Sequence, residues 1–594
     1  MNKILVISLL LLSLSLTAAP IGEKRAREIA TNFFSSTSAT RSGSAPTIEL
    51  EWAGFGMGQA IPYNNATRTR SADKASDDAL MYIYNRTDSE GFVIVAGDDC
   101  AKRDIIAFSH DNTFNTEDMT EGAQAILQAW CEDIAASRKS KSSEGRTTFS
   151  VTRNTKELLY TTAKWAQGNP YNKQCPMLND GRAITGCVAT AAAIIFYYHR
   201  YPDKGIGETE EYSYTKDGSK ITIPNHTLGR TFDYDQMLPT YKYVKYTDEQ
   251  ADAISTLMVD IGTAIHINYG VESTSGNITR MAQQMIEHFG YSKNMQYLRR
   301  ASYEDDEWFD MLRKNLDTYG PTYHRGENSS GGGHAYVLDG YKANDYFHIN
   351  YGWNGSSNGY YLLPNISYCY DQRAIFNMAP DRDGTTKYKH VLTMDTKTIS
   401  GVKYTGIHTN ATQYKKGDSF QCFIYPVNSG LSSFKGKVCI AHCDKDGNIK
   451  KILCLYNLLE TSLSTSGYKP TLILKNEVED GDRLRVMYQG EGETEWVWAR
   501  RLSEVDTDEV LMCTSAEDLA KSLKIEYDKA TKSLSFGSDY ATQCSITDST
   551  DAVVVSGKTS ATQSTAISLV NLSSGEYNIS FAASGTPYTI KLKL

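Results

Sequence analysis

The chain lacks three patterns that would each point to a particular class of protein. Its eleven cysteines are scattered over 594 residues without any C-x-x-C pair, so neither a zinc ribbon nor a dense disulfide framework is indicated. It also lacks the H-E-x-x-H sequence of zinc peptidases. Its formal net charge of −9 leaves no basic field to replace the counterions of a nucleic acid. We therefore expect no nucleic-acid partner, no metal and no cofactor.

No apolar run after the N-terminus is long enough to cross a membrane. The run Ile4–Leu16 follows Lys3 and precedes small residues that end at Ala19. It is too short to span a bilayer, and this layout is typical of a secretory signal peptide. We expect residues 1–19 to be removed and the remaining chain to be secreted or held at the cell surface, without a membrane span.

The length of the chain predicts several domains. A chain of 594 residues usually folds as about three or four units. The residue patterns divide it into a mixed α/β unit (20–150), an α+β domain (151–380) and two β-sandwich modules (381–505 and 506–594). Residues 138–146 are polar and basic, and they form the best linker in the sequence. Exposed segments of this kind are where proteolytic nicking concentrates.

Local periodicity predicts individual helices and strands. The expected helices are residues 22–34, 121–137, 247–265, 278–289 and 304–319. The expected strands include 81–85, 91–98, 105–109, 334–341, 346–353, 438–442, 484–488, 575–581 and 588–594. Within 151–380 the helices come first and the hairpin follows, which predicts an α+β domain of two lobes. The segment Asp444–Asn448 begins like a calcium loop but has no glutamate at the twelfth position, so we expect a plain turn.

The run Thr185–His199 is typical of a helix buried on all sides, with Cys187 in its first turn. Thr185 can serve as the N-cap, and the alanines have high helix propensity. Backbone N–H groups and the helix dipole at this position favour a thiolate, which is the nucleophilic form of cysteine. We interpret Cys187 as a catalytic nucleophile. The alternative is a small thiol buried in the core.

A cysteine nucleophile needs a base within hydrogen-bonding reach, and three histidines of the domain compete for this role. His199 lies on the same helix as Cys187, roughly 18 Å away at 1.5 Å per residue, and is therefore excluded. His334 follows three glycines, which let the backbone come close to a substrate chain. His348 lies inside the facing strand.

A hairpin centred near Lys342 would place Asn350 opposite His334, because the two positions are equally far from the centre. An amide that faces an imidazole can accept its N–H and fix its orientation, as the third member of a Cys-His-Asn arrangement does. The alternatives are an ordinary strand role for His334 and a packing role for Asn350. The backbone N–H of Cys187 and the side chain of Gln167 are candidate oxyanion donors. Taken alone, Gln167 is a loop residue.

Several motifs together resemble streptopain and its relatives, which are secreted papain-like cysteine peptidases. The motifs are QGNPYN at 167–172, TGCVATA at 185–191, YHRYP at 198–202, GGHAYVLDG at 332–340, HINYGW at 348–353 and NGYY at 358–361. The match covers about residues 154–380 in the same order. It implies a papain-like, two-lobed catalytic domain that hydrolyses peptide bonds of proteins through a Cys thioester.

The resemblance also implies roles for individual residues. Cys187 takes the nucleophile position, His334 that of the general base and acid, Gln167 that of the oxyanion donor, and Gly333 lines the substrate groove. The family often has a tryptophan where this chain has Tyr351. The residue that orients the histidine therefore stays open between Asn350, Tyr351 and Trp353, and Trp353 is also a candidate substrate contact.

The first unit, which contains the strand 91–98, resembles the inhibitory propeptide of the same family. We therefore expect a zymogen that is cleaved between about Lys139 and Arg153, with the propeptide acting as an intramolecular inhibitor. The closing hairpin resembles C-terminal sorting or attachment modules of secreted proteases. The loop 268–277 is a candidate wall of the pocket for the substrate's second residue before the cut. Two alternative functions remain, a cell-wall peptide amidase and a non-catalytic surface-binding protein.

Overall fold

The computed structural model describes six long stretches of the chain and several short strands near its end. The long stretches are 19–37, 46–56, 77–140, 155–327, 333–363 and 370–514, with gaps at 102, 118, 120, 179–180, 217, 343–344, 412, 461–466 and 504–506. The short strands lie between 524 and 593. The predicted signal peptide up to residue 18 and the predicted cleavage region after residue 140 lie outside the described residues. No helix among the described residues is long and apolar enough to cross a bilayer.

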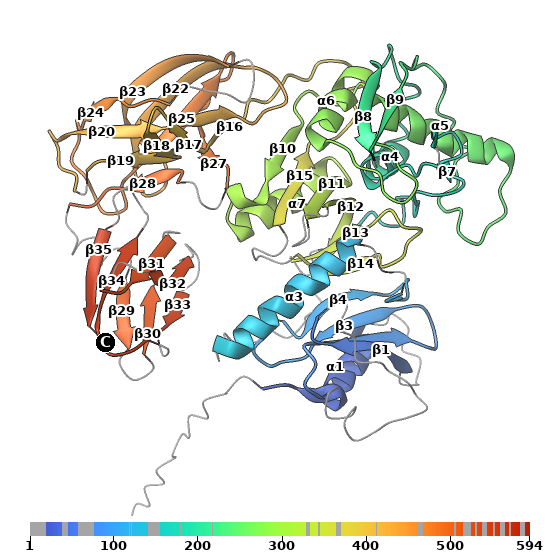
Figure 1. Ribbon diagram of the computed structural model, residues 1–594, viewed down its shortest axis with the longest axis horizontal. Coiled ribbons are helices and arrows are strands. Elements are labelled where there is room, and N and C mark those ends of the chain that lie inside the picture. Colours follow the sequence, from blue (N-terminus) through green and yellow to red (C-terminus); the bar gives the residue numbers. More distant parts are fainter. Residues whose placement is uncertain are drawn as a thin grey trace, which may run out of the picture.

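The first unit is a four-stranded antiparallel sheet with two helices (Figure 1). Its elements are α1 (Gly22–Thr37), β1 (Ile48–Gly54), β2 (Met81–Arg86), β3 (Phe92–Ala96), β4 (Ile105–Ser109) and α3 (Glu121–Ser140). The two helices and strands β2 to β4 confirm the predicted elements, whereas β1 was not predicted. Helix α3 continues past residue 137 into the predicted linker, where the Arg138 guanidinium pairs with the buried Asp98 carboxylate at 2.5 Å. We call this unit the prosegment.

The second domain has a helical lobe and a sheet lobe. Its helices are α4 (Cys187–His199), α5 (Asp248–Ala264), α6 (Ile278–Phe289) and α7 (Asp305–Thr318), with the short helix η1 (Arg300–Ser302). Its main strands are β10 (Gln296–Arg299), β11 (Thr322–Glu327), β12 (Gly333–Lys342), β13 (Tyr346–Asn350), β14 (Gly359–Leu362) and β15 (Tyr370–Phe376). Short strands add β5 (Thr155–Glu157), β6 (Met177–Leu178), β7 (Gly181–Arg182), β8 (Tyr212–Lys216) and β9 (Ser219–Ile223). The predicted α+β class is confirmed, although the β8–β9 hairpin was not predicted.

The prosegment and the sheet lobe share one continuous eleven-stranded sheet. Its order is β1-β2-β3-β4-β14-β13-β12-β11-β15-β10, with β5 beside β12. The junction is antiparallel, and Phe108 of β4 pairs with Tyr360 of β14. Helix α3 packs on the same sheet, and the Trp130 indole N–H donates to the Leu362 carbonyl at 3.1 Å. The prosegment is therefore bound to the second domain by strand addition at a sheet edge as well as by side-chain packing.

The two faces of this sheet pack into different hydrophobic cores, because alternating residues point to opposite faces. Tyr323, Val337 and Ile375 belong to the core that contains helix α4. Leu338 and Phe376 belong to the other core, together with α7, α3 and the prosegment strands. Because neighbouring strand residues point to opposite faces, α4 and α3 cover opposite sides of the sheet. The prosegment thus packs mainly against the face away from Cys187.

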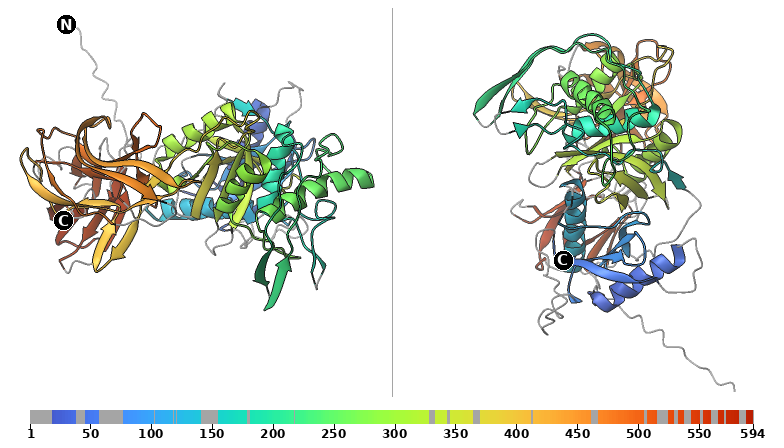
Figure 2. Two further views of the ribbon diagram at one scale, coloured as in Figure 1. Left: turned by 90° about the horizontal axis from the view of Figure 1, so that it is seen from above. Right: turned by 90° about the vertical axis from the view of Figure 1, so that its right-hand side faces the viewer.

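Two β-rich modules follow the catalytic domain, and the helical lobe lies at the other end of the long axis (Figures 1 and 2). The first contains β16 (Leu392–Met394), β17 (Thr396–Ile399), β18 (Val402–Thr405), β19 (Ile407–Thr409), β20 (Ser419–Ile424), β21 (Pro426–Asn428), β22 (Phe434–Cys443), β23 (Ile449–Glu460), β24 (Thr471–Ile473), β25 (Arg483–Gly490), β26 (Val497–Trp498), β27 (Arg500–Arg501) and β28 (Glu509–Leu511). Strands β19, β20, β22 and β25 share one core. Strand β28 pairs with β25, so this module extends beyond the predicted boundary at residue 505.

The second module consists of two small sheets. Its strands are β29 (Ile525–Asp528), β30 (Ser533–Phe536), β31 (Gln543–Thr547), β32 (Val553–Lys558), β33 (Thr565–Ser568), β34 (Glu576–Phe581) and β35 (Tyr588–Lys593). The sheet orders are β29-β30-β33 and β32-β31-β34-β35. The predicted closing hairpin is therefore confirmed as the antiparallel pair β34–β35.

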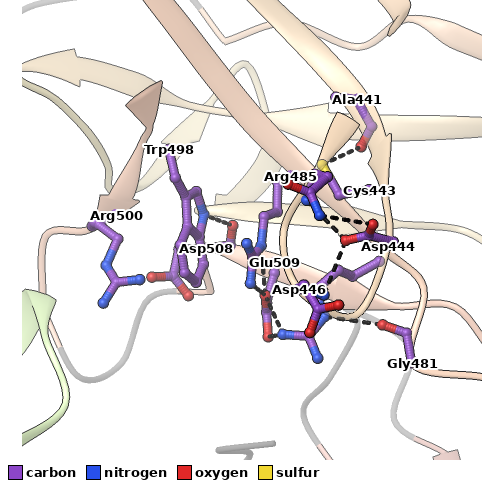
Figure 3. A network of polar contacts seen from close by, with 12 residues as sticks. Ala441, Cys443, Asp444, Asp446, Gly481, Arg485, Trp498, Arg500, Asp508 and Glu509 are labelled. Atoms are coloured by element: carbon purple, nitrogen blue, oxygen red, sulfur yellow. Dashed lines mark hydrogen bonds and ion pairs between the residues drawn. The ribbon is translucent and has the colours of Figure 1, made fainter. Parts of the chain in front are cut away.

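A cluster of aromatic and charged residues joins the first β module to the catalytic domain. The Trp498 indole stands between two guanidiniums, with its ring centroid 3.6 Å from Arg485 Cζ and 4.0 Å from Arg500 Cζ (Figure 3). Its N–H donates to the Asp508 carbonyl at 3.0 Å. The next residue, Arg501, pairs with Glu304 at 2.9 Å and donates to a main-chain carbonyl of η1 at 2.7 Å. These contacts fix the module against the start of α7.

The segment Asp444–Asn448 forms the turn between β22 and β23. The Asp444 carboxylate accepts from the backbone N–H groups of Asp446 at 2.9 Å and Asn448 at 2.8 Å. One carboxylate oxygen is thus used by the turn itself, as Asp side chains commonly do. The structure confirms the predicted turn.

Candidate active site

Cys187 is the first residue of α4, at the point where the chain approaches the loop 274–279. The N-cap is Gly186, at φ 80° and ψ 149°, and the predicted cap by Thr185 is wrong, because its hydroxyl instead hydrogen-bonds to the Thr190 hydroxyl at 2.8 Å. A Cβ atom at Gly186 would lie 2.7 Å from Thr274. Glycine is required here by both the positive φ and this close approach.

The Cys187 side chain is half-buried, and this distinguishes it from most described cysteines. Cys175 of the same domain, for comparison, is fully buried, and burial raises the pKa of its thiol to about 12. A thiol in that environment stays protonated and unreactive at neutral pH. Cys187 instead lines a pocket and is the first residue of helix α4.

His334 lies at the start of β12 and faces the same pocket as Cys187. Its Nε2 lies 3.0 Å from the main-chain carbonyl oxygen of Tyr351. Because a carbonyl only accepts, Nε2 donates, and in the neutral ring Nδ1 therefore carries the lone pair. This is the tautomer that a general base requires, and the hydrogen bond also orients the ring.

The two competing histidines are used elsewhere. His348 is buried, and its Nδ1 is paired with the Asp339 carboxylate. His199 ends α4, at the opposite end from Cys187, and burial lowers the pKa of its imidazole to about 4. Of the three histidines, His334 is the one that lines the pocket with Cys187.

The pocket has a volume of about 370 Å³ and lies between the two lobes. Cys187 and Val188 of α4 form one part of its wall, and Gly333, His334 and Ala335 form another. The segment 274–279 closes a third side, so residues 274–277 of the loop 268–277 line this pocket, and the assignment of the loop to the substrate's second residue before the cut stays a prediction. Tyr297, Arg325, Glu327 and Arg373 complete the lining.

The predicted pairing of His334 with Asn350 is wrong. Asn350 pairs with Val337, and Lys342 pairs with Tyr346, with an irregularity between Leu338 and Gly340. The turn is therefore centred near residue 344 rather than 342, and the bulge shifts the register again.

Asn350 nevertheless forms hydrogen bonds close to His334. Its Oδ1 accepts from the Gly352 N–H at 3.2 Å, and its Nδ2 donates to the Ala163 carbonyl at 2.8 Å. The Gly352 N–H belongs to the same planar peptide unit as the Tyr351 carbonyl that holds His334. Asn350 therefore contacts the peptide whose carbonyl accepts from His334, and its role in positioning the histidine stays a prediction.

Tyr351, rather than Trp353, supplies the aromatic surface beside His334. The Tyr351 ring is fully buried, and its centroid lies 6.2 Å from that of His334. Trp353 is 37% exposed and is not among the described residues that line the pocket. The structure thus does not place Trp353 at the predicted substrate contact, while Gly333 does line the pocket.

Gln167 is buried in the loop that precedes α4. Its main-chain carbonyl accepts from the Thr185 N–H at 3.0 Å, which holds the loop alongside the turn leading into Cys187. The side chain is not among the described residues that line the pocket. Its role as an oxyanion donor stays a prediction.

Two features of the site were not predicted from the sequence. The acceptor for His334 is a main-chain carbonyl, which carries no signal in the residue type. Of the charged residues, Arg325 and Glu327 lie on β11, and Arg373 lies on β15, 46 residues after Glu327. The alternation along β11 does place Arg325 on the same face as Tyr323, but the facing strand cannot be read from this pattern.

Two protein families match different parts of this chain. Residues 165–361 match the peptidase C10 family, and residues 18–134 match the Spi protease inhibitor family. Streptopain of Streptococcus pyogenes serotype M28 is 29% identical over 362 residues, which are 58% of this chain and 85% of the relative. The thiol protease/hemagglutinin PrtT of Porphyromonas gingivalis is 30% identical over 373 residues, which are 60% of this chain and 40% of that protein.

Two solved structures from Prevotella intermedia are also similar. A fragment of prointerpain A is 27% identical, with a TM-score of 0.44, and the match covers 56% of this chain and all of the fragment. The active cysteine protease interpain A is 33% identical, with a TM-score of 0.35, and the match covers 38% of this chain and 95% of that structure.

Proposed function

This chain belongs to the peptidase C10 family of cysteine proteases, and we propose that it is a secreted endopeptidase made as an inactive precursor. Its substrates are peptide bonds of proteins. The observation that carries the proposal is that Cys187 and His334 line one pocket while a main-chain carbonyl already holds His334 Nε2. A nucleophile and a correctly oriented base thus share one substrate-sized space.

The proposed reaction proceeds through a thioester. Nδ1 of His334 takes the thiol proton of Cys187, and the sulfur attacks the carbonyl carbon of the substrate. The backbone N–H of Cys187 and the side chain of Gln167 donate to the oxyanion. The imidazolium then protonates the leaving amine as the C–N bond breaks. His334 next takes a proton from water, which hydrolyses the thioester and restores the thiol.

Latency in this proposal comes from the prosegment. None of its described residues lines the pocket, but Asn112 Nδ2 donates to the main-chain carbonyls of Gly355 at 2.5 Å and Asn358 at 3.1 Å. The Asn358 side chain in turn accepts from the Tyr351 N–H at 3.0 Å. The prosegment is thus hydrogen-bonded to the loop that follows Tyr351, whose carbonyl accepts from His334. Cleavage after residue 140 would allow the prosegment to dissociate.

The substitution Cys187→Ala tests the function. We expect the precursor to fold, to lose all cleavage of casein, and to stop converting itself to the mature form. Cys175→Ala is the matched control, since Cys175 lies in the same domain but is buried away from the pocket. Casein cleavage at the wild-type rate by Cys187→Ala would refute the proposal. Measuring cell-wall peptide hydrolysis in parallel distinguishes an endopeptidase from an amidase.

A further inference from the structure

A cluster of charged side chains lines the end of the pocket formed by strands β10, β11 and β15. Arg325, Glu327 and Arg373 line the pocket, Asp371 pairs with the two arginines, and Arg299 lies next to Asp371. We call these five residues the charged cluster. The catalytic steps proposed above use none of them.

The charged cluster is internally paired but not electrically balanced. Asp371 accepts from Arg373 Nε at 2.7 Å and from Arg325 Nη1 at 3.1 Å, and it lies 3.6 Å from Arg299 Nη1. Glu327 pairs with Arg325. Three guanidiniums therefore share two carboxylates, which leaves one excess positive charge.

Partial burial strengthens the electrostatic attraction of this excess positive charge for an anion. The Arg325 and Arg373 side chains are only 14% and 18% exposed, so solvent screens them less than surface residues. Burial, followed by the nearby Arg373, lowers the pKa of Arg299, which is the direction that repulsion between neighbouring guanidiniums produces. Burial also acts to lower the pKa of Arg325, but Tyr297, Glu327 and Asp371 outweigh it and raise that pKa. An additional carboxylate would relieve this repulsion, and a guanidinium's five N–H donors leave capacity to bind it.

The rest of the pocket suits the stem of such a side chain. Val188, Ile278, Tyr297 and Ala335 also line the pocket and provide apolar or aromatic surface. Methylene groups can pack against this surface while a terminal carboxylate reaches the guanidiniums.

We infer that this pocket selects substrates with an acidic side chain, above all glutamate, at the position that enters it beside the cut bond. This inference rests on the proposed peptidase function and names its substrate class. Arg373 and Arg325 are the specificity-determining residues. Glu327 opposes them and disfavours a second acidic residue at the mouth of the pocket.

The test uses the matured full-length enzyme and fluorogenic peptides that differ at one position, scanned over the residues before the cut. At each position we compare glutamate with glutamine, which has the same shape without the charge, and with leucine and lysine. At one position we expect kcat/KM to be about tenfold higher for glutamate than for glutamine, because charge-assisted hydrogen bonds are stronger than neutral ones. This ratio should fall as salt is added.

Substitutions assign the effect to the pocket. Arg373→Met should bring the glutamate-to-glutamine ratio close to one, and Arg373→Glu should make lysine the preferred residue. Arg299→Met removes the excess charge but no described pocket-lining group, so it should lower the ratio only in part. Arg313→Met is the matched control, because Arg313 pairs with Asp310 on α7 and is not among the described residues that line the pocket, and it should keep the ratio. If the Arg373 variants do not fold, the ratio and its salt dependence in the unsubstituted enzyme decide.

The outcomes separate this inference from the proposed function. Efficient cleavage of leucine peptides, with a glutamate-to-glutamine ratio of one or less at every position, overturns the inference and leaves the peptidase function intact. Preference for lysine overturns it as well and assigns the pocket to Glu327. Absence of all cleavage, together with no labelling of Cys187 by an irreversible thiol inhibitor, overturns both.

Discussion

The substitution Asn350→Ala tests how the catalytic histidine is held. It removes two hydrogen bonds, the one from the Gly352 N–H to Oδ1 and the one from Nδ2 to the Ala163 carbonyl. It does not remove the Tyr351 carbonyl, which accepts directly from His334. The substitution therefore loosens the peptide that carries the acceptor without deleting the acceptor itself.

The magnitude follows from these contacts. Leaving a buried donor or acceptor unsatisfied costs about 1 to 3 kcal/mol, so the free energy of unfolding should fall by about 2 to 6 kcal/mol for the two groups. Catalysis should suffer less. If the looser peptide weakens the hold on His334 by the value of one hydrogen bond, kcat falls about tenfold. Removing a residue that touches the base directly costs about 10⁴-fold in a serine protease.

The assay combines urea denaturation with kcat measured against pH at a temperature where the variant is folded. Asn358→Ala is the matched control, because Asn358 is equally buried and accepts from the N–H of Tyr351, in the neighbouring peptide unit. It should lose about half as much stability, because one buried group rather than two is left unsatisfied, and it should lose less activity. A loss of about 10³-fold or more in kcat for folded Asn350→Ala would refute this reasoning, since it would mean that the amide contacts the imidazole directly.

Three further predictions concern the prosegment and the β module. Asn112→Ala removes two donors to the turn that follows Tyr351, so the precursor should mature about 5- to 100-fold faster, as followed by gel electrophoresis; an unchanged rate contradicts the proposed latency contact. Arg501→Ala breaks the ion pair with Glu304 and should make the junction between the first β module and the catalytic domain accessible to limited proteolysis. The free energy of unfolding in urea should fall by about 1 to 2 kcal/mol. An unchanged digestion pattern contradicts this prediction. Burial lowers the pKa of His110 to about 4, so the folded prosegment binds fewer protons than the unfolded chain between about pH 4 and 6.5. The stability of the prosegment should therefore fall as the pH drops from about 6.5 towards 4. The variant His110→Phe preserves the stacking on Phe33 and should show less of this acid sensitivity in thermal melts.

Much of the site could be predicted from local residue patterns. The apolar run after Cys187 can only be accommodated as a buried helix, and the structure buries nearly all of its residues. The distance along that helix excludes His199, and the glycines before His334 indicate a close approach of the backbone. The capping box of Thr247 and Gln250 likewise marks the start of α5 within one residue of the predicted position.

The register of the β12–β13 hairpin could not be predicted in this way. The alternation of residues along each strand is clear, but the pairing depends on the turn length and on the irregularity after Leu338. Because the observed register differs from the predicted one by a few residues, Asn350 contacts the peptide that binds His334 rather than His334 itself. The acceptor for His334 is a main-chain atom, and main-chain atoms are the same in every residue.

The sequence by itself was enough to predict a nucleophile, a base and the order of the units, because these predictions depend on residue identity and on periodicity along one element. Only the tertiary structure decided that the prosegment continues the catalytic sheet through β4 and β14, and that Arg325 and Arg373 meet at the end of the pocket. The physical reason is that both features join strands far apart along the chain. Their pairing is set by the packing of both faces of the sheet, and no single segment encodes it.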